Sequence, residues 1–450
     1  MPLPPSLLTS LESVKGFHRE AFEGVHASGE QVTSIRLNPC KPSLVHGPLS
    51  MDQIPWCPLG RYLSKRPSFT LDPLLHAGAY YVQEASSMFL WHVLKEVTGS
   101  DTKKKILDLC AAPGGKSTLL ASYFTDGLII ANEVIKQRAA VLVENITKWG
   151  SDQVIVTNND PSHFTSLPGY FDMMVIDAPC SGSGLFRKDP DAVTEWSEGN
   201  VQLCSQRQQR ILADVLPALK EGGILIYSTC SYSPDENENI TDWLLAEMEM
   251  ENMRIPLAPE WGVVETVSPL LGGFGYRFYP DQVKGEGLFI AVFQKKSGTR
   301  FVRLKEQSLV LPSKQESQQV NHFIEIPQHY SLFKPSAAVR AIKTEWVADL
   351  RLLAQCLYIK KAGVEIATLK GKDLIPSHEL ALSLLPLDAM VSMELTEEES
   401  LKYLRKKELL PNGRAGWNLI RYCGLPLGWV KVLPNRINNY YPAEWRILKE

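Results

Sequence analysis

The chain has 450 residues, of which 44% are hydrophobic and 22% are charged, and its formal net charge is −3. These values are ordinary for folded proteins, so they exclude a mostly disordered chain, and the length favours two to four domains. The small net charge excludes a protein coated in positive charge, although a local basic face remains compatible with nucleic-acid binding.

Charged residues interrupt the first thirty positions, so we predict neither a secretory signal nor a membrane span. The eight cysteines contain no Cys-x-x-Cys pair and no tight spacing, which argues against a disulfide scaffold and against a zinc site. We therefore expect no metal and a reducing, cytoplasmic compartment.

Residues 1–100 mix helical and extended patterns. The segment TSIRLNPCKPS, residues 33–43, predicts a strand that runs into a turn broken by proline. Residues 80–94, YYVQEASSMFLWHVL, predict an amphipathic helix. We predict that this part forms a family-specific α+β region.

From residue 101 to residue 296, short apolar runs alternate with stretches long enough for helices. The runs that we predict as strands are residues 105–110, 127–133, 153–160, 171–178, 222–230 and 288–296. Alternation of strand and helix at this spacing predicts a parallel sheet with helices on both faces.

Residues 297–390 are expected to contain a polar connector, up to about residue 336, and a small α/β subdomain. Residues 391–450 form the last predicted region, where residues 396–410 predict a solvated amphipathic helix. From Pro411 onward, positive charges alternate with aromatic rings, a combination that suits RNA but that also fills the core of a small barrel. These residues are Arg414, Arg421, Lys431, Arg436, Arg446 and Lys449, with Trp417, Tyr422, Trp429, Tyr440, Tyr441 and Trp445.

The loop after the first predicted strand of the sheet reads DLCAAPGGKS, Asp108 to Ser117. A glycine-rich turn between a strand and a helix offers backbone N–H groups to a ligand. A phosphate-binding P-loop would need glycine where Cys110 stands, and the dinucleotide pattern G-x-G-x-x-G is also missing. Neither nucleotide motif is therefore favoured.

Three acids end three successive predicted strands: Glu133, Asp160 and Asp177. Open α/β sheets bind ligands at the carboxyl ends of their strands, where a carboxylate can accept the hydroxyls of an adenosine ribose. The set suits a ligand such as S-adenosylmethionine. The alternative is that each acid only caps the helix that follows it.

Two predicted strands of this sheet deliver a cysteine at their end: Cys180 in VIDAPCSGSG, shortly after Asp177, and Cys230 in ILIYSTCSYS, at the end of the next predicted strand. Because both follow strands of one sheet, we expect the two cysteines to lie close together. The alternative is that both are small buried hydrophobic residues, as we expect for Cys40, Cys57, Cys204, Cys356 and Cys423.

Several segments in order resemble the signatures of the Sun/Fmu-type RNA cytosine-5 methyltransferases: SIRLNP, YYVQEASSM, CAAPGGKS, DAPCSGSG with RKDPD, and YSTCSYSPDENE. The resemblance covers roughly residues 34–296. The tail GRAGWNLIRYCGLPLGWVKV is similar to that of the bacterial ribosomal small-subunit methyltransferase F branch. One departure is Arg187-Lys188, where many relatives have two arginines, so one fork for bidentate phosphate contact is lost.

The resemblance implies a Rossmann-like core of the class I S-adenosylmethionine-dependent methyltransferases at residues 101–296, an RNA-binding N-terminal region, and a PUA-like β-barrel at residues 391–450 that also binds RNA. It implies S-adenosylmethionine as the cofactor and RNA as the partner, and we expect a monomer. The cofactor-binding residues that we predict are Cys110, Ala111, Ala112, Pro113, Gly114, Gly115, Lys116, Glu133, Asp160 and Asp177.

Carbon 5 of cytosine is a poor nucleophile, and addition of a thiolate to carbon 6 makes it reactive. The family implies Cys230 as this nucleophile and Cys180 as the residue that helps the adduct break down. Backbone N–H groups and a cationic sulfonium nearby are expected to lower a cysteine pKa. Asp177 is predicted to accept a hydrogen bond from the cytosine amino group. Lys116 is predicted to neutralise the pyrimidine oxygen, unless it is a solvated helix residue.

The predicted function is formation of 5-methylcytosine in small-subunit (16S) ribosomal RNA. One alternative is the same chemistry on transfer RNA, which the catalytic loops do not distinguish. The other is a non-catalytic RNA-binding or ribosome-assembly factor, and the presence of the four predicted catalytic residues counts against it.

Overall fold

The computed structural model describes residues 3–41, 51–189, 191–298, 307–371, 373–409 and 413–449. Several predicted features extend beyond these residues. They are the end of the first turn at residues 42–43, Pro190 of the RKDPD segment, residues 299–306 of the connector, Leu410 at the end of the predicted helix, Pro411 and Glu450. Within the described ranges, the search for a helix long and apolar enough to cross a membrane finds none.

The described part of the N-terminal region contains the four α-helices α1 to α4 and a four-stranded sheet of order β2-β3-β1-β4. Strand β1, Thr33–Leu37, lies where the sequence predicts it. The predicted helix over residues 80–94 is wrong at its start, because Tyr80–Val82 form strand β4 and pair with β1. These aromatic and β-branched residues favour a strand once a partner strand is available. The remaining elements are α1 Pro5–Leu11, α2 Arg19–Ala27, β2 Met51–Ile54, β3 Cys57–Leu63, η1 Phe69–Leu71, α3 Pro73–His76, η2 Ser86–Phe89 and α4 Leu90–Thr98.

A ten-stranded sheet forms the centre of the molecule, with the order β11-β12-β13-β9-β8-β5-β6-β7-β16 and with β10 beside β13. All six predicted strands are present. They are β5 Lys105–Asp108, β6 Leu128–Asn132, β7 Val154–Thr157, β8 Phe171–Asp177, β9 Leu219–Thr229 and β13 Leu288–Lys295. Strands β9, β8, β5, β6 and β7 lie side by side in this order and run parallel to one another. Strand β13 lies next to β9 and is antiparallel to it.

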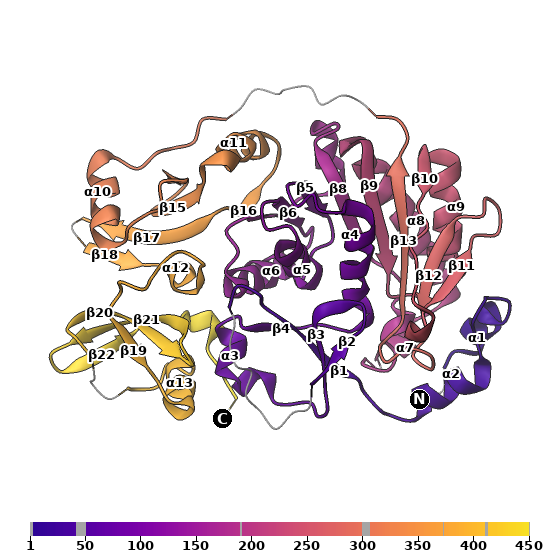
Figure 1. Cartoon of the computed structure of the whole chain (residues 1–450), viewed down its shortest axis with the longest axis horizontal. Helices are drawn as coiled ribbons and strands as arrows, with labels where there is room; N and C mark the ends of the chain where they lie inside the picture. Colours follow the sequence, from indigo (N-terminus) through magenta and orange to yellow (C-terminus); the bar gives the residue numbers. More distant parts are fainter. Residues whose placement is uncertain are drawn as a thin grey trace.

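Helices cover both faces of this sheet, as the alternating pattern predicts (Figure 1). The helical elements are α5 Gly115–Tyr123, α6 Lys136–Trp149, η3 Pro161–Ser166, η4 Ser183–Leu185, α7 Asp191–Glu195, α8 Glu198–Val215, η5 Leu216–Ala218, η6 Pro234–Glu236, α9 Glu238–Glu247 and η7 Pro259–Trp261. The chain continues from β5 to β6 and β7 on one side, and places β8 and β9 on the other. The strand order therefore reverses at β5, and such a switch point is where open α/β sheets bind ligands.

Strands β10 Met250–Asn252, β11 Val264–Val267, β12 Phe274–Phe278 and β16 Ile359–Lys361 extend the sheet without having been predicted. Strand β16 comes from the later part of the chain and pairs with β7. Their sequences, MEN, VETV, FGYRF and IKK, mix polar and apolar residues, so no continuous apolar run reveals them.

The last part of the chain forms two further four-stranded sheets, β14-β15-β17-β18 and β19-β20-β21-β22. The expected connector contains helix α10, Lys314–Phe323, which begins with a capping box between Ser313 and Glu316. The predicted helix over residues 396–410 is present as α13, Glu397–Leu404. The other elements are β14 Tyr330–Phe333, β15 Ala338–Lys343, η8 Thr344–Trp346, α11 Val347–Cys356, β17 Val364–Lys370, β18 Asp373–Pro376, α12 His378–Leu382, β19 Ser392–Glu394, β20 Gly416–Tyr422, β21 Leu425–Leu433, β22 Arg436–Asn439 and η9 Ala443–Trp445.

Candidate active site

The glycine-rich loop joins β5 to α5 at the switch point of the central sheet. Gly114 precedes α5 with φ +116°, and a Cβ at this position would lie 3.2 Å from Leu142. Arg36 of β1 donates to the carbonyl oxygen of Gly115 at 3.2 Å, and its side chain is fully buried. The N-terminal region therefore holds the loop that the sequence predicts as the cofactor site.

Two residues of α6 hold the other side of this loop. Arg138 Nη2 donates to the carbonyl oxygen of Ala112 at 2.8 Å, and Asn145 Nδ2 donates to that of Pro113 at 2.8 Å. Because these carbonyls are engaged by side chains, the loop has a defined backbone conformation before any ligand binds.

A pocket of about 190 Å³ lies beside the loop. The predicted residues that line it are Cys110, Ala111, Ala112, Pro113, Gly115, Lys116 and Asp177. Residues 81–84 and Ser87 of the N-terminal region form the opposite wall of the pocket, and they were not predicted as site residues. The predicted site residues outside this lining are Gly114, Glu133, Asp160, Cys180 and Cys230.

Lys116 and Asp177 form an ion pair in this pocket, with 2.7 Å between Nζ and Oδ2. Ser228 donates to the other carboxylate oxygen at 2.8 Å, and Lys116 Nζ donates to Ser87 at 3.2 Å. The lysine side chain is 11% exposed, so the alternative of a solvated helix residue is wrong. Burial by itself lowers the pKa of Lys116, but the Asp177 carboxylate outweighs it, and the net pKa is raised.

Of the other two predicted acids, only Asp160 caps the helix that follows it, because α6 after Glu133 begins without a side-chain cap. Glu133 Oε1 accepts from the backbone N–H of Ile135 at 2.9 Å. Asp160 caps η3 by accepting from the backbone N–H of Ser162 at 3.0 Å. These contacts use one oxygen of each carboxylate, and Glu133 Oε2 is buried without a hydrogen bond, 3.4 Å from Arg138 Nη1.

A fourth acid, Asp108 at the end of β5, was not predicted as a site residue. It is fully buried, accepts from Ser117 Oγ at 2.6 Å, and leaves Oδ1 without a hydrogen bond. Burial raises the pKa of Asp108 to about 7. In the sequence its only mark is its position at a strand end beside the glycine-rich loop.

The thiols of Cys180 and Cys230 lie 3.1 Å apart. Their strands β8 and β9 are parallel neighbours, so the expected proximity is confirmed. Gly184 N–H donates to the carbonyl oxygen of Cys230 at 2.7 Å, and a Cβ on Gly184 would lie 2.7 Å from that oxygen. The two cysteine loops can approach this closely because position 184 is glycine.

The pKa of Cys180 differs from the expectation of a lowered value. Its hydrogen bond with Cys230, its burial and nearby negative charges raise the pKa of Cys180 well above the usual range. In this arrangement Cys180 is therefore the thiol form.

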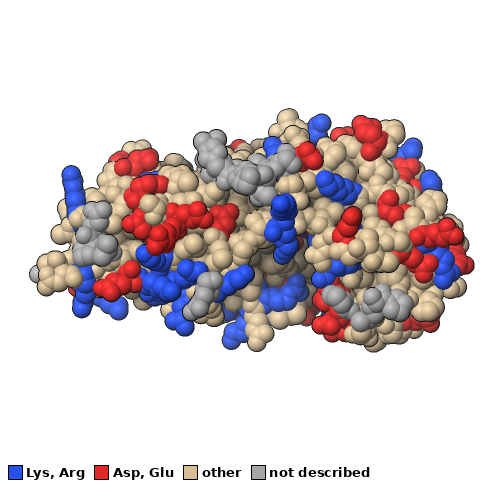
Figure 2. All heavy atoms as spheres, turned by 90° about the horizontal axis from the view of Figure 1, so that it is seen from below, with Lys and Arg blue, Asp and Glu red and all other residues tan. Residues whose placement is uncertain are grey.

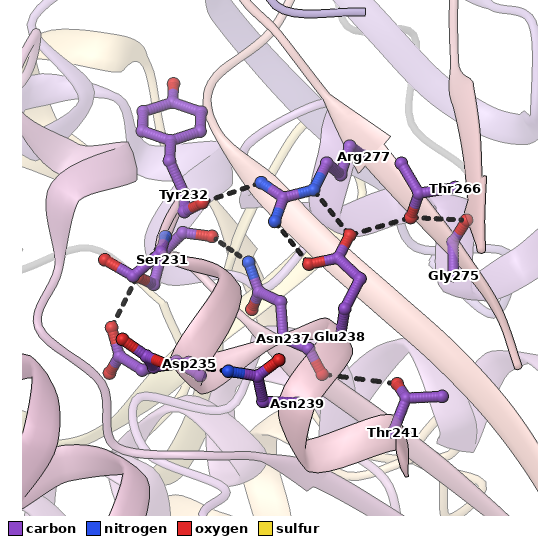
Figure 3. Close-up of polar contacts among 12 residues, drawn as sticks. Ser231, Tyr232, Asp235, Asn237, Glu238, Asn239, Thr241, Thr266, Gly275 and Arg277 are labelled. Carbon is purple, nitrogen blue, oxygen red and sulfur yellow. Dashed lines mark hydrogen bonds and ion pairs between the residues drawn. The ribbon is translucent and has the colours of Figure 1, made fainter. Parts of the chain in front are cut away.

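Residues after Cys230 hold its loop in place, and none of them was predicted as functional (Figure 3). Asn237 Nδ2 donates to the carbonyl oxygen of Ser231 at 2.8 Å. Arg277 of β12 donates to the carbonyl oxygen of Tyr232 at 2.7 Å and pairs through two nitrogens with the carboxylate of Glu238. The ion pair is almost fully buried. It links the cysteine loop to α9 and to the antiparallel part of the sheet.

The expectation that the remaining cysteines are small buried residues is confirmed only in part. Cys57 and Cys204 are buried, and Cys356 is half-buried. Cys40 and Cys423 are exposed, so the prediction is wrong for both. Both lie in turns, Cys40 after β1 and Cys423 between β20 and β21 with φ +49°.

The basic tail divides into core and surface residues. Trp429 and Tyr441 are buried in a core. Arg414, Arg436, Arg446 and Lys449 are exposed, whereas the remaining charged and aromatic residues predicted there are half-buried. Figure 2 shows Lys and Arg side chains gathered over the C-terminal half of one face and in a hollow toward its centre.

The doubly wound sheet, the glycine-rich loop and acids at its switch point, and the neighbouring thiol pair together define a methyltransferase of the α/β class. Residues 97–294 match the family described as "16S rRNA methyltransferase RsmB/F". Residues 3–85 match "N-terminal domain of 16S rRNA methyltransferase RsmF", and residues 391–447 match "Methyltransferase RsmF PUA domain". The chain belongs to the RsmB/F family of methyltransferases.

Relatives resemble the chain over most of its length. "Ribosomal RNA small subunit methyltransferase F" of Aliivibrio fischeri is 30% identical over 466 residues, which cover 98% of this chain and 97% of the relative. The protein of that name from Cronobacter sakazakii is 30% identical and covers 87% of this chain, with 84% of its own length matched.

Among solved structures, a methyltransferase homolog protein from Pyrococcus horikoshii is 29% identical with a TM-score of 0.52. The match covers 65% of this chain and all of that one. NSun6 from the same organism has a TM-score of 0.54 at 20% identity over 65% of this chain and 98% of its own, and so it shows the fold alone.

Proposed function

We propose that this methyltransferase forms 5-methylcytosine in small-subunit ribosomal RNA, with S-adenosylmethionine as the methyl donor. The observation that carries the proposal is the pair of thiols 3.1 Å apart at the ends of two adjacent strands, next to the strand whose glycine-rich loop lines the pocket. The names of the relatives support ribosomal RNA as the substrate.

The residues around the loop suit the cofactor. A sulfonium is a cation, and the buried carboxylates of Asp108 and Glu133 each leave one oxygen without a hydrogen bond. We propose that the loop residues 110–116 bind the cofactor, with Glu133 and Asp160 at the ribose and base. Bound S-adenosylmethionine supplies an electrophilic methyl group.

We propose that the Cys230 thiolate adds to carbon 6 of the cytosine, which shifts electron density to carbon 5. Lys116 stabilises the negative charge that develops on the pyrimidine oxygen. Asp177, whose side chain is 38% exposed, accepts a hydrogen bond from the cytosine amino group. Once carbon 5 carries the methyl group, a base takes the carbon 5 proton, the bond between carbon 6 and sulfur breaks, and Cys230 leaves as the thiolate, with Cys180 assisting this elimination.

We also propose how the rest of the chain contributes. Residues 1–100 and 391–450 contact RNA, residues 101–296 catalyse, and residues 297–390 connect them. The exposed basic residues of the C-terminal region support this division. We propose a cytoplasmic monomer, and light scattering after gel filtration should give a mass near 50.4 kDa.

Bisulfite sequencing of total RNA tests the substrate. In cells that lack the protein, a cytosine of small-subunit ribosomal RNA should lose its methyl mark. The wild-type chain should restore it, and Cys230→Ala, as the matched control, should not. Loss of marks only in transfer RNA contradicts the proposed substrate, and restoration by Cys230→Ala contradicts the proposed chemistry.

A further inference from the structure

One buried carboxylate, that of Glu236, lies behind both cysteine loops. Its side chain is fully buried. Oε1 accepts from the backbone N–H of Ser181 at 2.8 Å, and Oε2 accepts from Ser181 Oγ at 2.5 Å and from Ser231 Oγ at 2.5 Å. Ser181 follows Cys180 and Ser231 follows Cys230. A single side chain therefore binds the residue next to each thiol.

The sequence around the two cysteines has the same form, Cys-Ser-x-Ser, at residues 180–183 and 230–233. The second serines take part in the same cluster. Ser183 Oγ accepts from the N–H of Tyr232 at 2.8 Å, and Ser231 Oγ accepts from the N–H of Ser233 at 3.1 Å. The hydroxyls thus connect two irregular loops that the ladder between β8 and β9 does not reach.

Helix α8 fixes Glu236 from the other side. Gln208 Nε2 donates to Glu236 Oε1 at 3.1 Å and to the carbonyl oxygen of Pro179 at 3.0 Å. Tyr227 OH donates to the carbonyl oxygen of Glu236 at 2.7 Å. The carboxylate accepts four hydrogen bonds in total. Burial raises the pKa of Glu236, and the hydrogen bonds from Ser181, Ser231 and Gln208 oppose this shift by favouring the charged form.

We propose that Glu236 is a positioning residue that sets the separation of the Cys180 and Cys230 thiols. This deepens the proposed function and rests on it for the assignment of the two cysteines. Glu236 acts through Ser181 and Ser231, and not on the substrate. Its charge also contributes to the raised pKa of Cys180, which keeps that thiol protonated while Cys230 reacts.

Glu236→Gln keeps the size of the side chain but replaces one acceptor oxygen with a donor NH₂ group. An amide cannot accept from both serine hydroxyls and the Ser181 N–H in the same geometry. We therefore expect the two loops to separate and the thiols to lose their fixed distance. The matched control is Asp235→Asn, because Asp235 is exposed and binds Asn239 instead of the cysteine loops.

Phenylarsine oxide measures the thiol pair directly, because it forms two As–S bonds with neighbouring thiols and releases water. On the full chain without RNA or cofactor, we expect one equivalent to bind the wild type and Asp235→Asn equally. Glu236→Gln should bind at least tenfold more weakly, and Cys180→Ala should lose this site. The kcat for methylation should fall in Glu236→Gln with little change in KM.

Wild-type arsenical affinity in folded Glu236→Gln contradicts the proposal, whatever the RNA substrate is. If circular dichroism shows that Glu236→Gln does not fold, the variants Ser181→Ala and Ser231→Ala test the proposal instead. Each removes one hydroxyl donor, so each should weaken arsenical binding, and unchanged binding in both overturns the proposal. Failure of ribosomal RNA methylation with intact arsenical effects would instead contradict only the proposed substrate.

Discussion

At the scale of single residues, the site depends on a buried lysine that a partly exposed carboxylate keeps charged. Lys116 keeps its proton in a buried position because Asp177 lies 2.7 Å away. Removing one partner of such a pair leaves the other charge without compensation. The carboxylate therefore has two effects, since it contacts the pocket and it also keeps the lysine charged.

Asp177→Asn should reduce kcat/KM about 100-fold or more, equivalent to about 2.7 kcal/mol of transition-state stabilisation. The neutral amide no longer holds the Lys116 proton, and burial then lowers the lysine pKa. Steady-state methylation assays measure the loss. Asp172→Asn is a suitable control, because Asp172 lies at the other end of β8 and pairs with Lys220. Equal losses in both variants would contradict the role of Asp177.

The two cysteines should give different trapped species. Cys180→Ala should form the bond to RNA and transfer the methyl group but release product slowly, so a protein–RNA band should persist on a denaturing gel. Cys230→Ala should give neither band nor product, and the double variant should match it, because a later step is invisible once the first is blocked. A stable band from Cys230→Ala and none from Cys180→Ala would reverse the proposed roles.

At the scale of elements, the Cys230 loop is stabilised from α9 and β12. The Glu238–Arg277 pair is almost fully buried, and Arg277 also binds the carbonyl oxygen of Tyr232 (Figure 3). Two elements far apart in the sequence thus set the position of one loop. The catalytic strands alone would leave this loop free to move, since β9 ends at Thr229.

Arg277→Met should lower the free energy of unfolding by about 3–5 kcal/mol, because Glu238 remains buried and unpaired. Replacing both partners, Arg277→Met with Glu238→Leu, should cost less than the single change, since no isolated charge is left. Urea unfolding followed by circular dichroism provides both values. A double variant less stable than Arg277→Met would show that the ion pair itself, and not the unpaired charge, dominates.

At the scale of the whole molecule, residues of the N-terminal, central and C-terminal regions meet around the buried side chain of His378. His378 of α12 packs against Tyr441 and Trp445, and both of its ring nitrogens are buried without a hydrogen bond. Burial and the nearby positive charges of Lys148 and Lys41 lower the pKa of His378 to about 3. This histidine is therefore neutral in the folded chain at neutral and mildly acidic pH.

The contribution of His378 to stability should therefore depend on pH. Between its folded pKa of about 3 and the unfolded value of 6.5, only the unfolded state binds the proton, so stability is lost as pH falls below 6.5. The loss approaches about 1.4 kcal/mol per pH unit for one group. In urea unfolding, His378→Phe should remove a pH-dependent loss of about 1.4 kcal/mol between pH 7.5 and 5.5, the interval over which the unfolded histidine takes up most of its proton. An unchanged slope contradicts this assignment.

The C-terminal region shares a hydrophobic core with the end of α3, because Ala77, the residue after this helix, packs in the cluster that contains Tyr403, Leu404 and Ile420. Deleting the chain from Glu394 would expose this core, so substitutions test RNA binding more cleanly than truncation. Arg446 and Lys449 are exposed, and Lys449 Nζ lies 3.3 Å from Ser68 Oγ of the N-terminal region.

The double variant Arg446→Gln/Lys449→Gln should weaken RNA binding and flatten its salt dependence. Each phosphate contact removed should reduce the slope of log K against log salt by roughly 0.7–0.9. Cofactor binding should not change. Filter binding at several salt concentrations measures the slope, and Lys314→Gln on α10 is a control distant in sequence. A slope equal to that of the wild type would make these two residues structural.

The sequence by itself determined the parallel part of the central sheet and the antiparallel strand β13, but not the strands β10, β11, β12 and β16. Apolar runs and their spacing are local properties, so the six predicted strands and the positions of Cys180 and Cys230 follow from them. Proximity of the two cysteines follows as well, because both lie at the same edge of one parallel sheet.

The tertiary structure alone decided which distant residues complete the site. Tyr80–Val82 form a strand because β1 is there to pair with them, and the same segment then forms a wall of the pocket. Arg36 comes from strand β1, which precedes the glycine-rich and cysteine loops in the sequence, and Arg277 comes from strand β12, which follows them. Contacts between segments tens of residues apart depend on the strand order and on side-chain packing, and no local pattern in the sequence records them.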